Sequence, residues 1–167
     1  MGNKLILLLT SVLMPYILCC QETKLVESQV FYDKTNQLPV FRISKQGEKI
    51  EVDYYTALDT INSISINVGF IGGVERLHKY CDSLYYANFS EENYNEVNVR
   101  VPYSILLDNE LRVREVHILQ RLPLYKYDEK YDYDSLIKKI LLSTDGQWFK
   151  KDKENNWYLY VGLFHLK

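Results

Sequence analysis

The sequence predicts an α+β fold in which two helices pack on a small antiparallel sheet, in the order helix, strand, strand, helix, strand. Three observations predict this class. Two segments after residue 70 repeat apolar residues at helical spacing. Three other segments of the same half alternate apolar and polar residues, or are apolar on both faces, as strands do. Before residue 70 further strand-like runs occur, so we expect a strand-rich N-terminal extension.

The extension contains a predicted hairpin. Val40–Ile43 and Lys49–Val52 are rich in β-branched and aromatic residues, and Ser44–Gly47 between them supplies the turn. A short helix is expected at Tyr54–Thr60. In Ile64–Phe70 apolar residues alternate with small or polar ones, which predicts a strand.

The first long helix is expected after Gly72-Gly73, which interrupt the preceding strand. Glu75 would lie in its first turn, where a carboxylate suits the helix dipole. The helix should end near Tyr85–Asn88. Its apolar stripe is Val74, Leu77, Cys81 and Leu84.

The clearest strand is Val97–Leu107, in which every second residue is apolar. Asp108–Glu110 makes the following turn, with Asn109 expected to take the positive φ of a tight hairpin. Leu111–Gln120 returns as the partner strand. Its apolar residues change parity, which predicts a β-bulge near Arg114–Glu115.

Pro123 ends this strand and a tyrosine-rich charged loop follows. A second helix begins at a cap formed by Asp132 or Asp134, and Gly146 is its expected stop. The final run, Trp157–His165, is apolar on both faces and predicts a strand. The buried stripe of the second helix is Tyr133, Leu136, Ile137, Ile140 and Leu141.

Residues 1–19 are predicted to be a signal peptide, which divides the chain into this leader, an extension at 20–69 and a domain at 70–167. Lys4 precedes the apolar stretch Leu5–Leu18, which Pro15 interrupts and which is shorter than the roughly 20 residues that span a bilayer. The leader could alternatively stay as an anchor. Ile17–Cys20 resembles a bacterial lipobox, with Cys19 as an unusual occupant of the small position, which implies lipidation of Cys20. Alternatively, the two cysteines lie near the cleavage site by chance. We expect an exported protein, in the periplasm or held at the membrane as a lipoprotein of a Gram-negative envelope.

The composition disfavours nucleic-acid binding and gives little support for catalysis. Twenty Lys and Arg stand against 22 Asp and Glu without a basic block, and phosphate affinity needs concentrated basic residues. We expect no cofactor and no metal. His78, His117 and His165 lie on separate predicted elements and are expected at the surface. Cys81 with His78 is the one nucleophile–base candidate, but its position on the apolar stripe predicts a buried, inert thiol.

Acidic residues also gather in the loop before the second helix and at its start. Tyr and Lys interleave with them, and the glycine of a calcium-binding loop is missing. A solvated loop is therefore expected rather than a calcium site. The carboxylates concerned are those of Asp128, Glu129, Asp132 and Asp134.

Four short sequence motifs after residue 70 occur in the order and spacing typical of one family. They are Phe70-Ile71-Gly72-Gly73, then Leu84–Ala87 at the end of the helix, then Val97–Leu107 followed by Asp108-Asn109, and finally Gly146–Trp148. Over Phe70–Lys167 the chain resembles the C-terminal domain of TonB energy-transducer proteins, in the form common among Bacteroidetes. The family usually has Pro at the positions of Ile71 and Ala87, and Gly at that of Asn109.

The resemblance implies a binding head. The sequence shows neither the membrane-spanning helix nor the Pro-rich spacer of a full transducer, so we expect the binding domain of a transducer without these two parts. In the family, the last strand receives a short N-terminal segment of TonB-dependent outer-membrane receptors. The corresponding peptide-binding edge strand is Tyr158, Leu159, Tyr160, Val161, Gly162, Leu163 and Phe164.

Three alternatives stay open. The N-terminal extension could cover the last strand. The protein could be a structural or accessory envelope lipoprotein, self-packed or a homodimer, with no receptor role. A small secreted hydrolase is the third possibility, and its nucleophile would be Cys81.

Overall fold

The structure is a computed structural model that describes residues 27–55, 61, 63–88, 99–120, 132–154 and 156–166. Two helices and nine strands are assigned within these ranges. They are β1 (Glu27–Tyr32), β2 (Pro39–Gln46), β3 (Lys49–Tyr54), β4 (Ile64–Ser65), β5 (Val68–Phe70), α2 (Gly73–Ala87), β6 (Val99–Leu107), β7 (Val113–Ile118), α3 (Tyr133–Leu142), β8 (Trp148–Lys150) and β9 (Trp157–Leu166).

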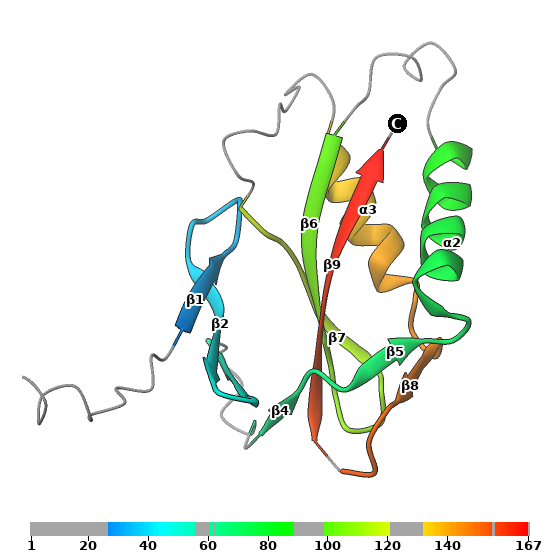
Figure 1. Cartoon of the computed structure of the whole chain (residues 1–167). Coiled ribbons are helices and arrows are strands. Elements are labelled where there is room, and N and C mark those ends of the chain that lie inside the picture. The colour runs from blue at the N-terminus through cyan, green and yellow to red at the C-terminus, as the bar shows by residue number, and fades with distance from the viewer. Residues whose placement is uncertain are drawn as a thin grey trace, which may run out of the picture.

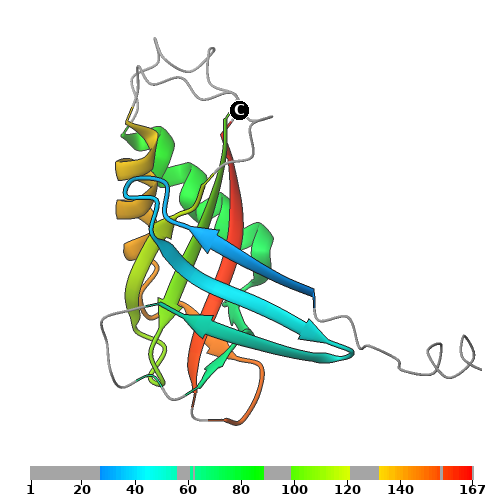
Figure 2. The same ribbon diagram turned by 90° about the vertical axis from the view of Figure 1, so that its left-hand side faces the viewer.

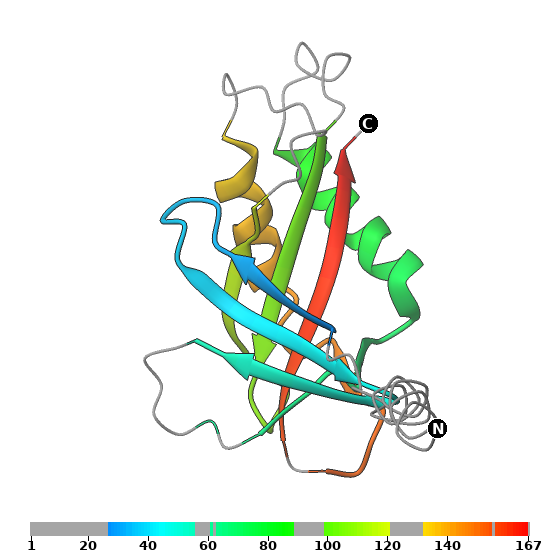
Figure 3. The ribbon, with the colours of Figure 1, turned by 60° about the vertical axis from the view of Figure 1, so that its left-hand side comes forward.

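These elements form three layers (Figure 1). The central layer is a four-stranded sheet in the order β4-β9-β6-β7, antiparallel except for the short parallel pair of β4 with β9. Helices α2 and α3 cover one face of it, and the antiparallel sheet β1-β2-β3 crosses the other face (Figures 2 and 3). The predicted fold class, two helices on a small antiparallel sheet with a strand-rich extension, is therefore confirmed.

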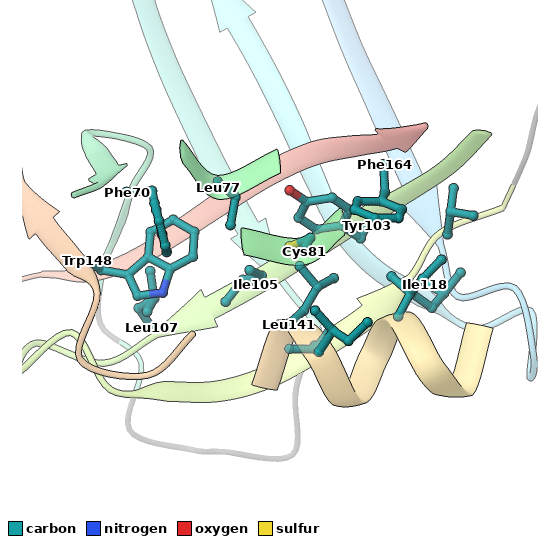
Figure 4. Close-up of a cluster of buried hydrophobic side chains, with 14 of the residues drawn as sticks. Phe70, Leu77, Cys81, Tyr103, Ile105, Leu107, Ile118, Leu141, Trp148 and Phe164 are labelled. Carbon is teal, nitrogen blue, oxygen red and sulfur yellow. The ribbon is translucent and has the colours of Figure 1, made fainter. Parts of the chain in front are cut away.

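The main core lies between the helices and the central sheet. Leu77 and Cys81 of α2 and Leu141 of α3 meet Tyr103 and Ile105 of β6 in this layer (Figure 4). At one end of the layer the Phe70 and Trp148 rings pack edge to face, with centroids 5.4 Å apart. These two residues belong to β5 and β8, which pair antiparallel as a separate two-stranded sheet.

A second core lies between the two larger sheets. Val40 and Phe41 of β2 pack with Leu119 and with Leu159 of β9, and all four side chains are buried. Strand β9 is thus covered on its helix-facing side and, at Leu159, on the opposite side. Burial on both faces explains the apolar residue at Leu159, but not those at Val161 and Leu163, which are exposed on the same face.

Several local expectations are confirmed. β2 and β3 form the predicted hairpin, and Asp132 caps α3 by accepting a hydrogen bond from the backbone amide of Ser135 at 3.1 Å. Opposite β6, Leu106 pairs with Glu115 but Leu107 pairs with Val113, so Arg114 is the extra residue of the predicted bulge.

Other expectations are wrong in detail. Ile64–Phe70 is not one strand: β4 pairs with β9 and β5 with β8, and the chain turns between them at Ile66. Val74 is 54% exposed, because it stands in the first turn of α2, beyond the covered part of the stripe. In the turn after β6 the positive φ, 64°, belongs to Leu111 and not to Asn109.

A few expectations concern other parts of the chain. Tyr54, expected to begin a short helix, is the last residue of β3. The rest of that helix up to Thr60, apart from the exposed Tyr55, lies outside the described residues, as do residues 97–98, the charged loop 125–128 and the leader 1–19. Strand β8 was not predicted from the sequence.

Candidate functional site

The predicted peptide-binding residues lie on β9 and divide between its two faces. Tyr158, Tyr160 and Phe164 point to the helix side, where all three pack in or against the main core. Leu159 is buried on the opposite face under the N-terminal sheet. Farther along that face, Val161 and Leu163 are 39% and 40% exposed.

The outer edge of β9 has a β-partner only at its start. β6 pairs with β9 along its whole length on the inner side. On the outer side β4 pairs with Trp157 and Tyr158 alone, and the amide of Trp157 donates to the carbonyl of Ser63 at 3.2 Å. Within the described ranges no other strand pairs with this side of β9.

Backbone alternation decides which groups this edge presents. The N–H and C=O of one strand residue point to the same side, and the side changes with every residue. Since the amide of Trp157 faces β4, the backbone groups of Leu159, Val161 and Leu163 point to the outer edge as well. The parallel pair Ser65–Tyr158 already uses the amide of Leu159. Beyond β4 the edge therefore offers the carbonyl of Leu159 and both backbone groups of Val161 and Leu163.

The edge strand carries no charge that would discourage pairing. Trp157–Leu166 contains no Lys, Arg, Asp, Glu or Pro. Proteins usually protect an exposed edge with such residues, because a long uncharged edge is a template for another strand. The structure thus provides an edge suited to β-strand addition.

The N-terminal sheet takes part in this region without closing the edge. Its side chains cover Leu159, so the extension does pack over the last strand at this residue. An open recess of about 290 Å³ on the same sheet is lined by Phe31 and Ile43, together with Gln29 and Lys45 and the start of β1. Phe31 and Ile43 also pack against the cluster that contains Leu159, so the recess adjoins the covered part of β9.

The sequence analysis did not predict the polar cluster that surrounds His117. His117, expected as a separate surface residue, contacts two carboxylates: its Nδ1 lies 2.8 Å from Oδ2 of Asp33 and its Nε2 lies 3.1 Å from Oε2 of Glu115. Asp33 and His117 are 84 positions apart, so no local sequence motif indicates that they are in contact.

This cluster differs from a hydrolytic triad. Ser104 is the cross-strand partner of His117 and is buried, but its Oγ has no hydrogen-bond partner. The Nε2 atom that would activate a serine contacts Glu115 instead. The arrangement therefore fits a structural role better than nucleophilic catalysis.

The remaining candidates are placed individually. Cys81 is buried, and burial raises the pKa of its thiol to about 12, with Asp82 adding to the effect. His78 is exposed on α2. Asp132 caps α3 and Asp134 forms an ion pair with Lys34. Across the part of the chain that the structure describes, no three His, Cys, Asp or Glu side chains are grouped as a metal site.

The predicted lipidation residue Cys20 lies outside the described residues. Of the helices that the structure describes, none has the length and apolar character needed to cross a membrane. Comparison of the chain with protein-family models, with curated proteins and with solved structures gives no match. The similarity to the TonB C-terminal domain thus stays a prediction from the sequence.

Proposed function

We propose that this chain is an extracytoplasmic binding module that adds an extended peptide of an envelope protein to the outer edge of β9. The observation that carries the proposal is the uncharged edge beyond β4, with Leu159, Val161 and Leu163 as its outward backbone positions. In strand addition the main chain provides affinity and alternate side chains provide specificity.

The expected strength follows from the length of this edge. The free carbonyl of Leu159 and the backbone groups of Val161 and Leu163 can make up to about five backbone hydrogen bonds, each worth about 0.5–1.5 kcal/mol net. Ordering a flexible peptide offsets much of that gain. Backbone bonds alone therefore give weak binding, and micromolar affinity requires added contributions where apolar peptide side chains contact Val161 and Leu163.

The sequence suggests the class of partner and the place of the encounter. By resemblance, the partner is the N-terminal segment of a TonB-dependent outer-membrane receptor. The leader would direct export, and a lipid on Cys20 would hold the module at a membrane surface of the envelope. The proposed activity is non-enzymatic and needs no nucleic acid, metal or cofactor.

The second candidate is a structural or accessory envelope lipoprotein, self-packed or homodimeric. The pairing of β4 with the start of β9 and the cover over Leu159 favour it, because both already satisfy part of the strand within one chain. In a homodimer the two β9 edges would pair with each other.

The test measures peptide binding site by site. Peptides from receptor N-terminal segments are titrated into the protein, and amide chemical shifts are followed by NMR. Binding should shift the amides of Leu159, Val161 and Leu163 more than those of β7. Absence of binding by the wild-type protein at high micromolar peptide overturns the proposal, and a β9-mediated dimer in sedimentation supports the second candidate.

A proline at one outward position sharpens the test. The N–H of Val161 faces the outer edge, so Val161→Pro removes a donor to the peptide while sparing the bonds to β6. Binding should weaken at least tenfold. Leu142→Ser, on an exposed apolar residue of α3, is the matched control and should bind as the wild type does.

A further inference from the structure

The contact between the N-terminal sheet and the central sheet contains a histidine held between two acids. His117 of β7 contacts Asp33 through Nδ1 at 2.8 Å and Glu115 through Nε2 at 3.1 Å. The hydroxyl of Tyr54 donates to the same Glu115 oxygen at 3.2 Å. We call Asp33, Tyr54, Glu115 and His117 the interlayer cluster.

The interlayer cluster joins separate layers of the fold. Tyr54 ends β3, and Asp33 follows β1, so both belong to the N-terminal sheet, whereas Glu115 and His117 belong to β7. Asp33 also forms an isolated antiparallel bridge with Leu119. Around this bridge the amide of Lys34 donates to Ile118 at 2.9 Å, and that of Gln120 donates to Tyr32 at 2.8 Å.

Limited solvent access strengthens the ionic contacts. The exposed fractions of the side chains are 12% for Asp33, 25% for His117 and 28% for Glu115. Burial by itself raises the pKa of Asp33. The hydrogen bond to His117 and those from the amides of Thr35 and Asn36 outweigh burial, so the pKa lies below its ordinary value.

The geometry requires a particular protonation state. An ionised carboxylate only accepts hydrogen bonds, whereas a neutral imidazole donates from one nitrogen and accepts at the other. With both acids ionised, both contacts of His117 are hydrogen bonds only when the ring is an imidazolium. A neutral ring leaves one nitrogen lone pair facing a carboxylate.

Among the described residues, the other groups around the ring do not replace this requirement. From β6 the cross-strand neighbour is the neutral Ser104, and from β3 it is the Tyr54 ring, with centroids 6.4 Å apart. Lys34, next to Asp33, is paired with Asp134 of α3. Two carboxylates therefore face the imidazole directly, and the nearest lysine of the bridge has its own acidic partner.

We propose that the interlayer cluster is a proton-operated clamp that fastens the N-terminal sheet to the central sheet. The clamp is complete when His117 is charged and both acids are ionised. It loosens as the pH rises and the ring loses its proton. It also loosens in strong acid: stability from Asp33 is present above the ordinary carboxyl range and is lost as the pH falls through the lowered value. Opening it would uncover Leu159 of β9.

Hydrogen exchange of the full chain tests the clamp. The exchange rates of the Lys34 and Gln120 amides, whose hydrogen bonds join the two sheets, are measured relative to β6 amides in the same sample, between about pH 5 and 8, where histidine changes charge. This ratio should rise tenfold or more toward the alkaline end, about the factor of one charge-assisted hydrogen bond. A flat ratio in the wild-type protein overturns the proposal.

Two variants distinguish an effect of the interlayer cluster on the exchange ratio from a general change in protein stability. His117→Gln has no titrating ring, so its ratio should not change over this range. Asp53→Asn breaks the exposed pair with Arg42, 2.6 Å apart on the outer face of the same sheet, and should keep the wild-type profile. A pH-dependent rise that persists in His117→Gln contradicts the clamp.

A measurement on the wild-type protein covers the case in which His117→Gln fails to fold. Nitrogen NMR of the His117 ring reports which ring nitrogens carry a proton at each pH. The exchange ratio of the Lys34 and Gln120 amides should rise as the ring goes from two protons to one. A ring that changes charge without any change in that ratio also overturns the proposal.

Discussion

The ring of Tyr103 on β6 lies across Gly162, its cross-strand partner on β9. A Cβ at position 162 would stand 2.5 Å from both Cζ and the hydroxyl oxygen of this ring. Tyr103 is 1% exposed and packed in the main core, so its ring has no solvent to move into. The missing side chain at Gly162 thus provides the space that a buried tyrosine occupies.

Gly162→Ala should therefore destabilise the protein although alanine suits a strand better than glycine. Overpacking of a buried site costs about 1–3 kcal/mol of unfolding free energy. Urea denaturation of the wild type and the variant measures the loss. In a Tyr103→Leu background the same substitution should cost clearly less, and an equal cost in both backgrounds would show that the ring is not the obstacle.

Thr144 supplies a second prediction, on the buried end of the helix layer. Its hydroxyl accepts from Nε1 of Trp148 at 3.1 Å and donates to the carbonyl of Leu141 at 2.6 Å. Thr144→Val keeps the shape but leaves the indole N–H buried without an acceptor, at a cost of about 1–3 kcal/mol. Chemical denaturation and tryptophan fluorescence report the change. Ser143→Ala, one residue away, removes a hydroxyl that contacts the Ile140 carbonyl at 2.6 Å and the Tyr80 hydroxyl at 3.0 Å, but water can replace it at this exposed site, so it should cost less than Thr144→Val.

The sequence was most informative where one face of an element is buried. The stripe of α3 follows directly from one-sided contact with the main core, so its residues were predicted. The alternation in β6 marks the face turned to the same core, although Ser104 and Leu106 on its other face are buried too. Short elements carry too few residues for a period to be recognised. The split of Ile64–Phe70 into β4 and β5, and the existence of β8, depend on pairing partners far along the chain.

In the candidate edge of β9 and in the interlayer cluster too, contacts between segments far apart in the chain leave no local pattern in the sequence. The sequence predicts the final strand at a sheet edge in a three-stranded arrangement. In the four-stranded sheet β4 lies outside it, and the pairing of β4 with its first two residues has no local signal. The interlayer cluster has none either, since Asp33 follows β1 and His117 sits in β7, and only the packing of two sheets brings them together.

Asp108 gives a prediction about acid. Its side chain is 5% exposed, and its Oδ1 accepts from the amides of Glu110 at 2.9 Å and Arg112 at 3.0 Å. Burial alone raises the pKa of Asp108, but the Arg112 amide and the Arg114 guanidinium outweigh it and hold the pKa below its ordinary value. The resulting stability is complete above the unfolded value and is lost as the pH falls through the folded one.

Asp108→Asn should thus lower the unfolding free energy at neutral pH by about 1–3 kcal/mol. The difference from the wild type should shrink as the pH falls below about 4, where the unfolded carboxyl begins to bind protons. Urea denaturation over a pH series measures both. Glu110→Gln, which breaks an exposed pair with Arg112, should cost less than about 1 kcal/mol. An undiminished difference in strong acid would mean that Asp108 acts through its shape rather than its charge.

Cys81 provides the last prediction, on reactivity. The thiol is 1% exposed, and burial, followed by the nearby Asp82, raises its pKa to about 12. Because the thiolate is the reactive form, Cys81 should resist a thiol reagent near pH 8 in the folded protein and react at once in denaturant. The measurement uses a Cys19→Ser/Cys20→Ser background, so that Cys81 is the one cysteine of the chain. Ser83→Cys, on the exposed side of the same helix, should react rapidly when folded. Rapid modification of folded Cys81 would place the thiol at the surface and reopen the question of a cysteine-based activity.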